Sequence, residues 1–313
     1  MPYPCLPPPP LQPGDLLRVI APSGTLREHE AFEQGVEIWR SHGYQVALSP
    51  GYKDRWGYLA GTDQQRRWQL ATALKDPACR GILCARGGYG GARLLEDWTW
   101  PDLKTEQAPK WLIGFSDITS LLWSLSQHQI SGVHGPLLTT LAAEPDWSVE
   151  RLFNWVAGKP LQPLQGIPWC LGRAQGCLLP ANLTVATHLL GTSAQAELEG
   201  VILALEDVGE APYRIDRMLT QWRMSGRFKN IRGIALGRFS QCQPPAHIPS
   251  LTVIDVLRDR LSDLGIPIVA ELPFGHDGPN AALPVGIMAE LDAEQGILCF
   301  HHPQPDESTV SNA

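Results

Sequence analysis

The chain has 313 residues, of which 43% are hydrophobic and 18% are charged. This composition excludes a disordered chain, a collagen-like repeat and a coiled coil, and the length suggests two domains. The formal net charge of −7 comes without a long basic run, which argues against nucleic acid or an anionic membrane as the main partner. The 30 glycines and 28 prolines predict many tight turns and favour an enzyme over a helical bundle.

The cysteines and the N-terminus predict a cytoplasmic protein. The seven cysteines are odd in number, include no CxxC pair, and occur in a chain too large to need disulfides. The proline-rich start, MPYPCLPPPP, lacks the basic and apolar regions of a signal peptide. No stretch approaches the ~18 continuous apolar residues of a membrane span, so no membrane partner is expected.

The first half of the chain is predicted to be α/β. Short apolar runs alternate with segments of helical spacing, and such alternation predicts a parallel sheet with helices on both faces. The expected strands are 16–21, 44–48, 80–85 and 110–114, and the expected helices are 27–42, 62–75, 92–98 and 117–127.

The second half is predicted to mix strand pairs with helices. Residues 159–169, rich in proline and without periodicity, are the expected linker between a domain over 14–158 and a domain over 170–303. The expected strands are 178–180, 201–205, 231–236 and 266–270, and the expected helices are 182–190, 212–224 and 251–264.

A serine after the fourth apolar run is the first candidate for chemistry. In open α/β sheets, ligands bind beyond the carboxyl ends of the strands. The segment GFSD at 114–117 would expose the Ser116 hydroxyl on a sharp turn, where the Asp117 N–H could donate to an oxyanion. The alternative is that Ser116 or Asp117 only caps a helix, since the full G-x-S-x-G pattern fails at Ile118.

A glycine-rich loop, RGGYGG at 86–91, follows the third apolar run. Its glycines let the backbone approach a ligand closely. The G-x-G-x-x-G spacing of a dinucleotide-binding loop fails, because position 93 is an arginine, and no clear acidic partner ends the next strand. An oxyanion-hole loop therefore fits better than a phosphate cradle, and a plain tight turn is the alternative.

Acidic and histidine side chains follow apolar runs elsewhere. Glu206, Asp207 and Glu210 could do acid–base work, bind a metal or orient a histidine, or they could be ordinary surface groups. His276 lies in a Gly/Pro-bounded loop, as a general base could, and His134 has similar surroundings, although loop histidines are more often structural. Neither shows HExxH or HxxxH spacing, so no metal is expected.

Together these segments resemble the serine LD-carboxypeptidases, the murein tetrapeptide carboxypeptidases with microcin-immunity peptidases as relatives. The resemblance covers residues from about 14 to 300 and implies an α/β fold, in which a flavodoxin-like parallel sheet with helices on both faces precedes a mixed β/α domain. The shared motifs, in order, are APSG at 21–24, ARGGYG at 85–90, GFSD at 114–117, HGP at 134–136, LED at 205–207 and GH..PN..LP at 275–284.

The resemblance implies a Ser–Glu–His triad. Ser116 would be the nucleophile, His276 the general base, and Glu206 the group that orients the imidazole. Backbone N–H groups of Gly88 and Asp117 would form the oxyanion hole. Because Ser116 belongs to the first domain and the other two to the second, the site is expected at the domain interface. No cofactor is implied, and a homodimer is expected because family relatives commonly form one.

The implied reaction removes the terminal D-alanine from cytoplasmic murein tetrapeptides in peptidoglycan recycling. Arg86 is a candidate for binding the substrate carboxylate, and a structural arginine is the alternative. Relatives that hydrolyse microcin-type acyl-adenylates share the triad, so the motifs leave the two substrate classes open. A non-catalytic sugar- or peptide-binding protein would not need all three residues, and a glutamine-amidotransferase-like domain would carry cysteine in place of Ser116.

Overall fold

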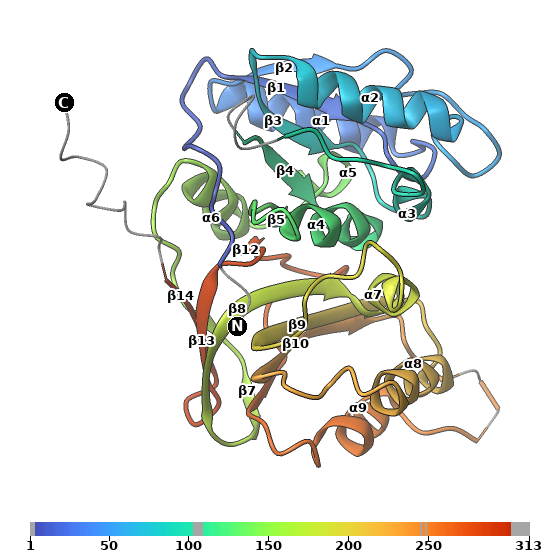
Figure 1. The fold of residues 1–313 in the computed structure, drawn as a ribbon, viewed down its shortest axis with the longest axis vertical. Helices are drawn as coiled ribbons and strands as arrows, with labels where there is room; N and C mark the ends of the chain where they lie inside the picture. Colours follow the sequence, from blue (N-terminus) through green and yellow to red (C-terminus); the bar gives the residue numbers. More distant parts are fainter. Residues whose placement is uncertain (1–3, 103–108, 245, 248, 302–313) are drawn as a thin grey trace.

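The computed structural model describes residues 4–102, 109–244, 246–247 and 249–301. Two β-sheets, one formed mainly by each half of the chain, are flanked by helices (Figure 1). The predicted fold class, a parallel sheet followed by a mixed β/α domain, is confirmed. Residues 302–303, the last two of the predicted C-terminal domain, lie outside the described residues.

The first sheet has six strands in the order β12-β5-β4-β3-β1-β2. Its first five strands in the chain are mutually parallel and follow the flavodoxin-like order 2-1-3-4-5. The sixth comes from far along the chain and pairs antiparallel with β5. The bounds are β1 Leu16–Ile20, β2 Gln45–Leu48, β3 Cys79–Cys84, β4 Trp111–Gly114, β5 Val133–His134 and β12 Leu283–Pro284.

Helices cover both faces of this sheet. One core joins the sheet to α1 (His29–Ser41), α5 (Leu138–Leu141) and α6 (Asp146–Val156), and another joins it to α2 (Asp63–Lys75), α3 (Gly91–Leu94) and α4 (Thr119–Ser126). In α1, Phe32, Val36 and Trp39 recur at helical spacing and are buried. The prediction of a helix to residue 98 is wrong, since α3 ends at Leu94 and the chain then turns through Asp97 at φ 56°.

The second sheet has eight strands in the order β6-β14-β13-β8-β9-β10-β11-β7. Strands β8 to β11 run parallel, and the outer strands pair antiparallel with their neighbours. The strands are β6 Leu164–Gln165, β7 Ile167–Cys170, β8 Arg173–Asn182, β9 Val201–Val208, β10 Gly233–Ser240, β11 Ile268–Ala270, β13 Met288–Asp292 and β14 Ile297–Phe300. The helices are α7 Leu183–Leu189, α8 Pro212–Met224 and α9 Val253–Leu261.

The segment predicted as a linker contains secondary structure. Strand β6 and most of β7 fall within 159–169, and both lie at edges of the second sheet. Strand β12, beyond β11 in the chain, returns to the first sheet. The chain therefore crosses between the two halves more than once, and the predicted boundaries at 158 and 170 stay a prediction.

One hydrophobic core runs through both halves of the molecule. It includes Leu121, Leu122 and Trp123 of α4 together with Leu183 and Ala186 of α7. The indole N–H of Trp123 donates to the carbonyl oxygen of Pro180 in β8 at 3.0 Å. Because α4 directly follows the GFSD turn, this contact fixes that turn against the second sheet.

Candidate active site

Ser116 lies on a sharp turn at the carboxyl end of β4. Its φ is +63°, a left-handed conformation that is uncommon for residues other than glycine and that occurs at functional sites. A 3₁₀ turn over Ser116–Ile118 leads into α4. The N-cap positions are Phe115 and Ile118, and neither makes a side-chain cap, so the alternative that Ser116 or Asp117 only caps a helix does not describe this turn.

The three residues of the predicted triad lie in one hydrogen-bonded row. Ser116 Oγ lies 3.0 Å from Nε2 of His276, and Nδ1 of the same imidazole lies 2.6 Å from Oε2 of Glu206. Ser116 follows β4, Glu206 lies in β9, and His276 lies in the loop between β11 and β12. The arrangement can move a proton from a hydroxyl to an imidazole backed by a carboxylate.

Glu206 is completely buried and is held by an asparagine that the sequence reasoning missed. Asn182 Nδ2 donates to Glu206 Oε1 and to Asp207 Oδ1, each at 3.2 Å. Asn182 Oδ1 accepts the Val185 N–H at 3.1 Å and so caps α7. Burial and the charge of Glu206 raise the pKa of Asp207 to about 6. The only signal in the sequence was an asparagine at the start of a predicted helix.

The environment of His276 favours its protonated form. Burial alone would lower the pKa of the imidazole, but the hydrogen bond and the negative charge of Glu206 outweigh burial and raise it above 6.5. The ring of Phe115 lies 4.7 Å from the imidazole, centroid to centroid. His276 is therefore held between a carboxylate and an aromatic ring, with Nε2 directed at the serine.

His134, the other histidine singled out in the sequence, has a different environment. It is completely buried in β5, and its ring meets Phe115 edge-on at 5.9 Å. Burial and the charge of His276 lower its pKa to about 3. Neither ring nitrogen has a hydrogen-bond partner within the described part of the chain. The structure thus places His276, and not His134, against Ser116.

The glycine-rich loop and the APSG turn are tied to the serine turn through a buried carboxylate. Asp117 Oδ2 accepts the Ser23 hydroxyl at 2.5 Å and the Gly91 N–H at 2.7 Å. Burial raises the pKa of Asp117. Gly88 has a φ of +105°, which favours glycine. Three motifs that are separated in the sequence thus meet at the Asp117 carboxylate. The oxyanion hole made by the N–H groups of Gly88 and Asp117 stays a prediction.

Gly87 lies directly against the nucleophile. A Cβ atom at this position would lie 3.0 Å from Cβ and 3.1 Å from Oγ of Ser116. We expect Gly87→Ala to lower kcat about 10- to 100-fold, because sub-ångström displacement of a reacting group is costly. Activity assays with thermal unfolding would check this. Gly233→Ala, where a Cβ would lie equally close to a neighbour, 3.0 Å from Leu291 Cδ2, but away from Ser116, is the matched control. Equal activity of the Gly87 variant and wild type would contradict the prediction.

Arg86, the predicted substrate-binding residue, has partners of its own. Its Nε donates to Glu28 at 3.0 Å, and its Nη1 donates to the carbonyl of Thr25 at 3.3 Å. A Cβ at Gly88 would lie 3.3 Å from Nη1, so the guanidinium does lie beside the glycine-rich loop. A role for Arg86 in substrate binding stays a prediction.

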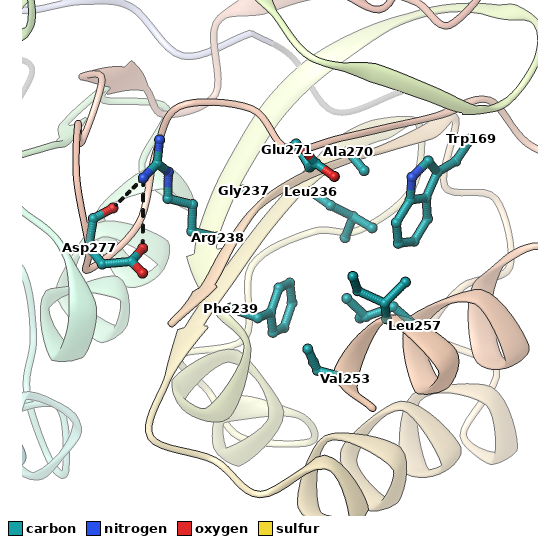
Figure 2. A pocket seen from close by; sticks show the side chains of 11 residues that line it. Trp169, Leu236, Gly237, Arg238, Phe239, Val253, Leu257, Ala270, Glu271 and Asp277 are labelled. Carbon is teal, nitrogen blue, oxygen red and sulfur yellow. Dashed lines mark hydrogen bonds and ion pairs between the residues drawn. The ribbon is translucent and has the colours of Figure 1, made fainter. Parts of the chain in front are cut away.

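A cavity of about 370 Å³ lies beside the loop that carries His276. Figure 2 shows its charged rim, where the Arg238 guanidinium contacts Asp277, the residue after His276. Its interior is mainly apolar, with Trp169, Leu236, Phe239, Val253, Leu257 and Ala270. The dimensions and lining are typical of small-ligand sites.

Two further observations concern metals and membranes. In residues 4–102, 109–244, 246–247 and 249–301, no group of three or more histidine, cysteine, aspartate or glutamate side chains is arranged to hold a metal ion. The same residues include no helix of the length and apolarity that crossing a bilayer requires.

Comparison with known proteins identifies the family. Residues 17–135 match the LD-carboxypeptidase N-terminal domain, and residues 175–291 match the LD-carboxypeptidase C-terminal domain. A putative carboxypeptidase of Synechocystis is 61% identical over 94% of this chain and 97% of its own length. The chain belongs to the LD-carboxypeptidase family. As a family member it is a serine-type carboxypeptidase, so the predicted enzyme class is confirmed.

One further relative and two solved structures are similar to the chain over most of its length. The murein tetrapeptide carboxypeptidase of Pseudomonas aeruginosa is 32% identical over 88% of this chain and 93% of its own. The crystal structure of muramoyltetrapeptide carboxypeptidase from Oxalobacter formigenes has a TM-score of 0.81 at 27% identity, covering 92% of this chain and all of that one. The microcin C7 self-immunity protein MccF, in complex with aspartyl sulfamoyl adenosine, shares the fold, with a TM-score of 0.85, 20% identity and coverage of 96% and 99%.

Proposed function

We propose that this LD-carboxypeptidase removes the terminal D-alanine from murein tetrapeptides by a Ser116–His276–Glu206 triad. The hydrogen-bonded row, 3.0 Å from Ser116 to His276 and 2.6 Å from His276 to Glu206, is the observation that carries the proposal. The left-handed turn at Ser116 supports it, because such a turn lifts the hydroxyl out of the sheet edge.

Acylation begins when Ser116 Oγ attacks the carbonyl carbon before the terminal residue. His276 Nε2 accepts the hydroxyl proton, and Glu206 stabilises the imidazolium through Nδ1–H. The Gly88 and Asp117 N–H groups hold the oxyanion; one preorganised donor contributes about 3–4 kcal/mol in comparable sites. When the C–N bond breaks, His276 returns its proton to the amine of D-alanine, leaving an acyl-serine.

Deacylation uses the same groups in reverse order. Water takes the place of D-alanine and loses a proton to His276 Nε2 as it attacks the acyl carbon. The second tetrahedral intermediate collapses, the C–Oγ bond breaks, and His276 returns the proton to Ser116 Oγ. The products are a tripeptide and free D-alanine, with the enzyme unchanged.

The choice of murein peptide rests on similarity to named relatives. The murein tetrapeptide carboxypeptidase of P. aeruginosa aligns over nearly the whole chain. The likeness to MccF favours a second candidate function, hydrolysis of acyl-adenylate analogues by the same triad. We also propose that the protein acts in the cytoplasm, where peptidoglycan fragments are recycled, and that it forms a homodimer. Size-exclusion chromatography with light scattering would test the dimer.

Liquid chromatography with mass spectrometry distinguishes the two substrates. We expect wild type to convert L-Ala-γ-D-Glu-meso-diaminopimelate-D-Ala to the tripeptide and to leave the same peptide ending in L-alanine intact. Aspartyl sulfamoyl adenosine serves as the second substrate. Cleavage of that compound without cleavage of the tetrapeptide would replace the proposed function by the acyl-adenylate alternative.

A further inference from the structure

The loop that carries the proposed base is fixed on one side by its own sheet. Arg238 of β10 donates its backbone N–H to the carbonyl of Phe274 and its Nη1–H to the carbonyl of Asp277, each at 2.9 Å. Figure 2 shows the arginine reaching across to Asp277. Gly275, at φ +136°, packs so closely that a Cβ would lie 3.0 Å from Cβ of Arg238. All of these contacts are made with Arg238, so they attach the loop to the second half of the molecule.

On its other side the same loop is bound to the first half of the molecule. Asn280, 1% exposed, donates its backbone N–H to Glu144 Oε2 at 2.8 Å, and its carbonyl oxygen accepts the Ser148 hydroxyl at 3.2 Å. Glu144 lies between α5 and α6, and Ser148 lies in α6.

The side chain of Asn280 carries this attachment back to the base. Its Oδ1 accepts the N–H of Gly275, the residue before His276, at 3.2 Å. Glu144 is therefore linked through Asn280 to the peptide unit beside His276. Asn280 belongs to the same GH..PN..LP motif as His276, but the triad and the oxyanion hole give the asparagine no role.

The geometry of the triad depends on the interface that this link crosses. Ser116 comes from the first sheet and His276 from the second half, so the 3.0 Å between them is set by how the His276 loop is seated. The core shared by α4 and α7 holds the two halves together and touches the His276 ring through Phe115, but it includes no residue of the segment 273–281. The β12–β5 pairing and the hydrogen bond from Arg151 Nε to the carbonyl of Ala282 at 3.0 Å attach the end of the loop to the first half, and the Glu144–Asn280 contact attaches the loop closer to His276.

We propose that Glu144, acting through Asn280, is a positioning residue that holds the His276 loop against the nucleophile. This inference rests on the proposed triad and goes beyond it by assigning a role to a residue outside every motif of the sequence. Glu144 does not contact the reacting atoms, and its effect is expected in kcat more than in KM.

Glu144→Ala, Glu144→Gln and Asn280→Ala test the link. We expect Glu144→Ala to lower kcat about 10- to 100-fold with KM within about threefold of wild type, as displacement of a base predicts. Glu144→Gln keeps an oxygen that accepts the Asn280 N–H and should restore kcat to within about threefold. Asn280→Ala should act like Glu144→Ala. Glu150→Ala, an exposed glutamate on α6, is the matched control and should behave like wild type.

Hydrogen exchange supplies a readout that does not depend on turnover. In Glu144→Ala we expect faster amide exchange in a peptide spanning 273–281, with exchange in α4 unchanged, whereas Glu150→Ala should alter neither. Unchanged kcat and unchanged exchange in Glu144→Ala would overturn the proposal, and so would a loss of activity that only follows a loss of folded protein. If wild type cleaves no tetrapeptide, the proposed substrate fails, while exchange and the rate of Ser116 labelling by a fluorophosphonate still decide the role of Glu144.

Discussion

Ser116→Ala is expected to abolish release of D-alanine, with kcat/KM lowered by about 10³–10⁶-fold. Ser116 is the nucleophile in the proposed triad, with its Oγ 3.0 Å from the imidazole. Alanine keeps the Cβ atom, so the left-handed turn and the core beneath it should persist. Mass spectrometry of the tetrapeptide reaction, with circular dichroism to verify folding, measures the effect.

Ser126→Ala is the matched control for this change. Ser126 lies at the end of α4, and its hydroxyl donates to the carbonyl of Trp123 at 2.7 Å, away from the row of three residues. This variant should retain wild-type turnover. Cleavage that persists in a folded Ser116→Ala protein would contradict the serine mechanism.

The second large effect is expected from Glu206→Gln, which should lower kcat about 10³–10⁴-fold. Glutamine keeps the size of the side chain and can keep a hydrogen bond to the imidazole, but it removes the buried negative charge that stabilises the imidazolium. An amide N–H turned toward Nδ1 would also favour the wrong tautomer. Steady-state kinetics on the tetrapeptide measure the loss.

The pH dependence of kcat/KM gives a second test of the same residue. A general base acts in its neutral form, so wild-type activity should rise with pH through the pKa of His276, which lies above 6.5. Burial lowers the pKa of His276. Once the charge of Glu206 is removed, the negative charges of Asp207 and Asp277 are left to oppose this effect. The acid limb of Glu206→Gln should therefore shift to lower pH, while its plateau falls.

Glu210→Gln is the control for the loss of a carboxylate from the same segment. Glu210 pairs with Arg214 at 3.3 Å at the start of α8 and does not contact the imidazole. Its variant should keep the wild-type rate and acid limb. A Glu206→Gln enzyme with the wild-type profile would contradict the role assigned to Glu206.

Local patterns predicted most elements of the fold. The helix expected at 212–224 is observed with those bounds, because Pro212 starts it and a buried face recurs at Ile215, Leu219 and Trp222. Strands of two residues, such as β5 and β12, were not predicted. They have no period to detect, and their pairing of Leu283 with His134 is made only in the folded chain.

The candidate site could be predicted only in part, for a physical reason. Ser116, Glu206 and His276 follow apolar runs in the sequence, so their positions near the carboxyl ends of strands could be predicted, and the resemblance to a family supplied their roles. The sequence also left His134 open as a base, and burial in β5 decided against it. Asn182 and Glu144 carried no such signal, because a polar residue in a loop or cap looks the same whether it contacts solvent or a catalytic group.

The sequence by itself determined the fold class, the family and the residues that can carry acid–base and nucleophilic chemistry. Those features are local, since they depend on periodicity, turn residues and motifs that span three to ten neighbouring residues. Only the tertiary structure decided that Ser116 meets His276 at 3.0 Å, that Asn182 supports Glu206, and that Glu144 binds the His276 loop from the opposite half. Such contacts join residues 24 to 160 positions apart, and their geometry is set by how two sheets pack, which no local pattern records.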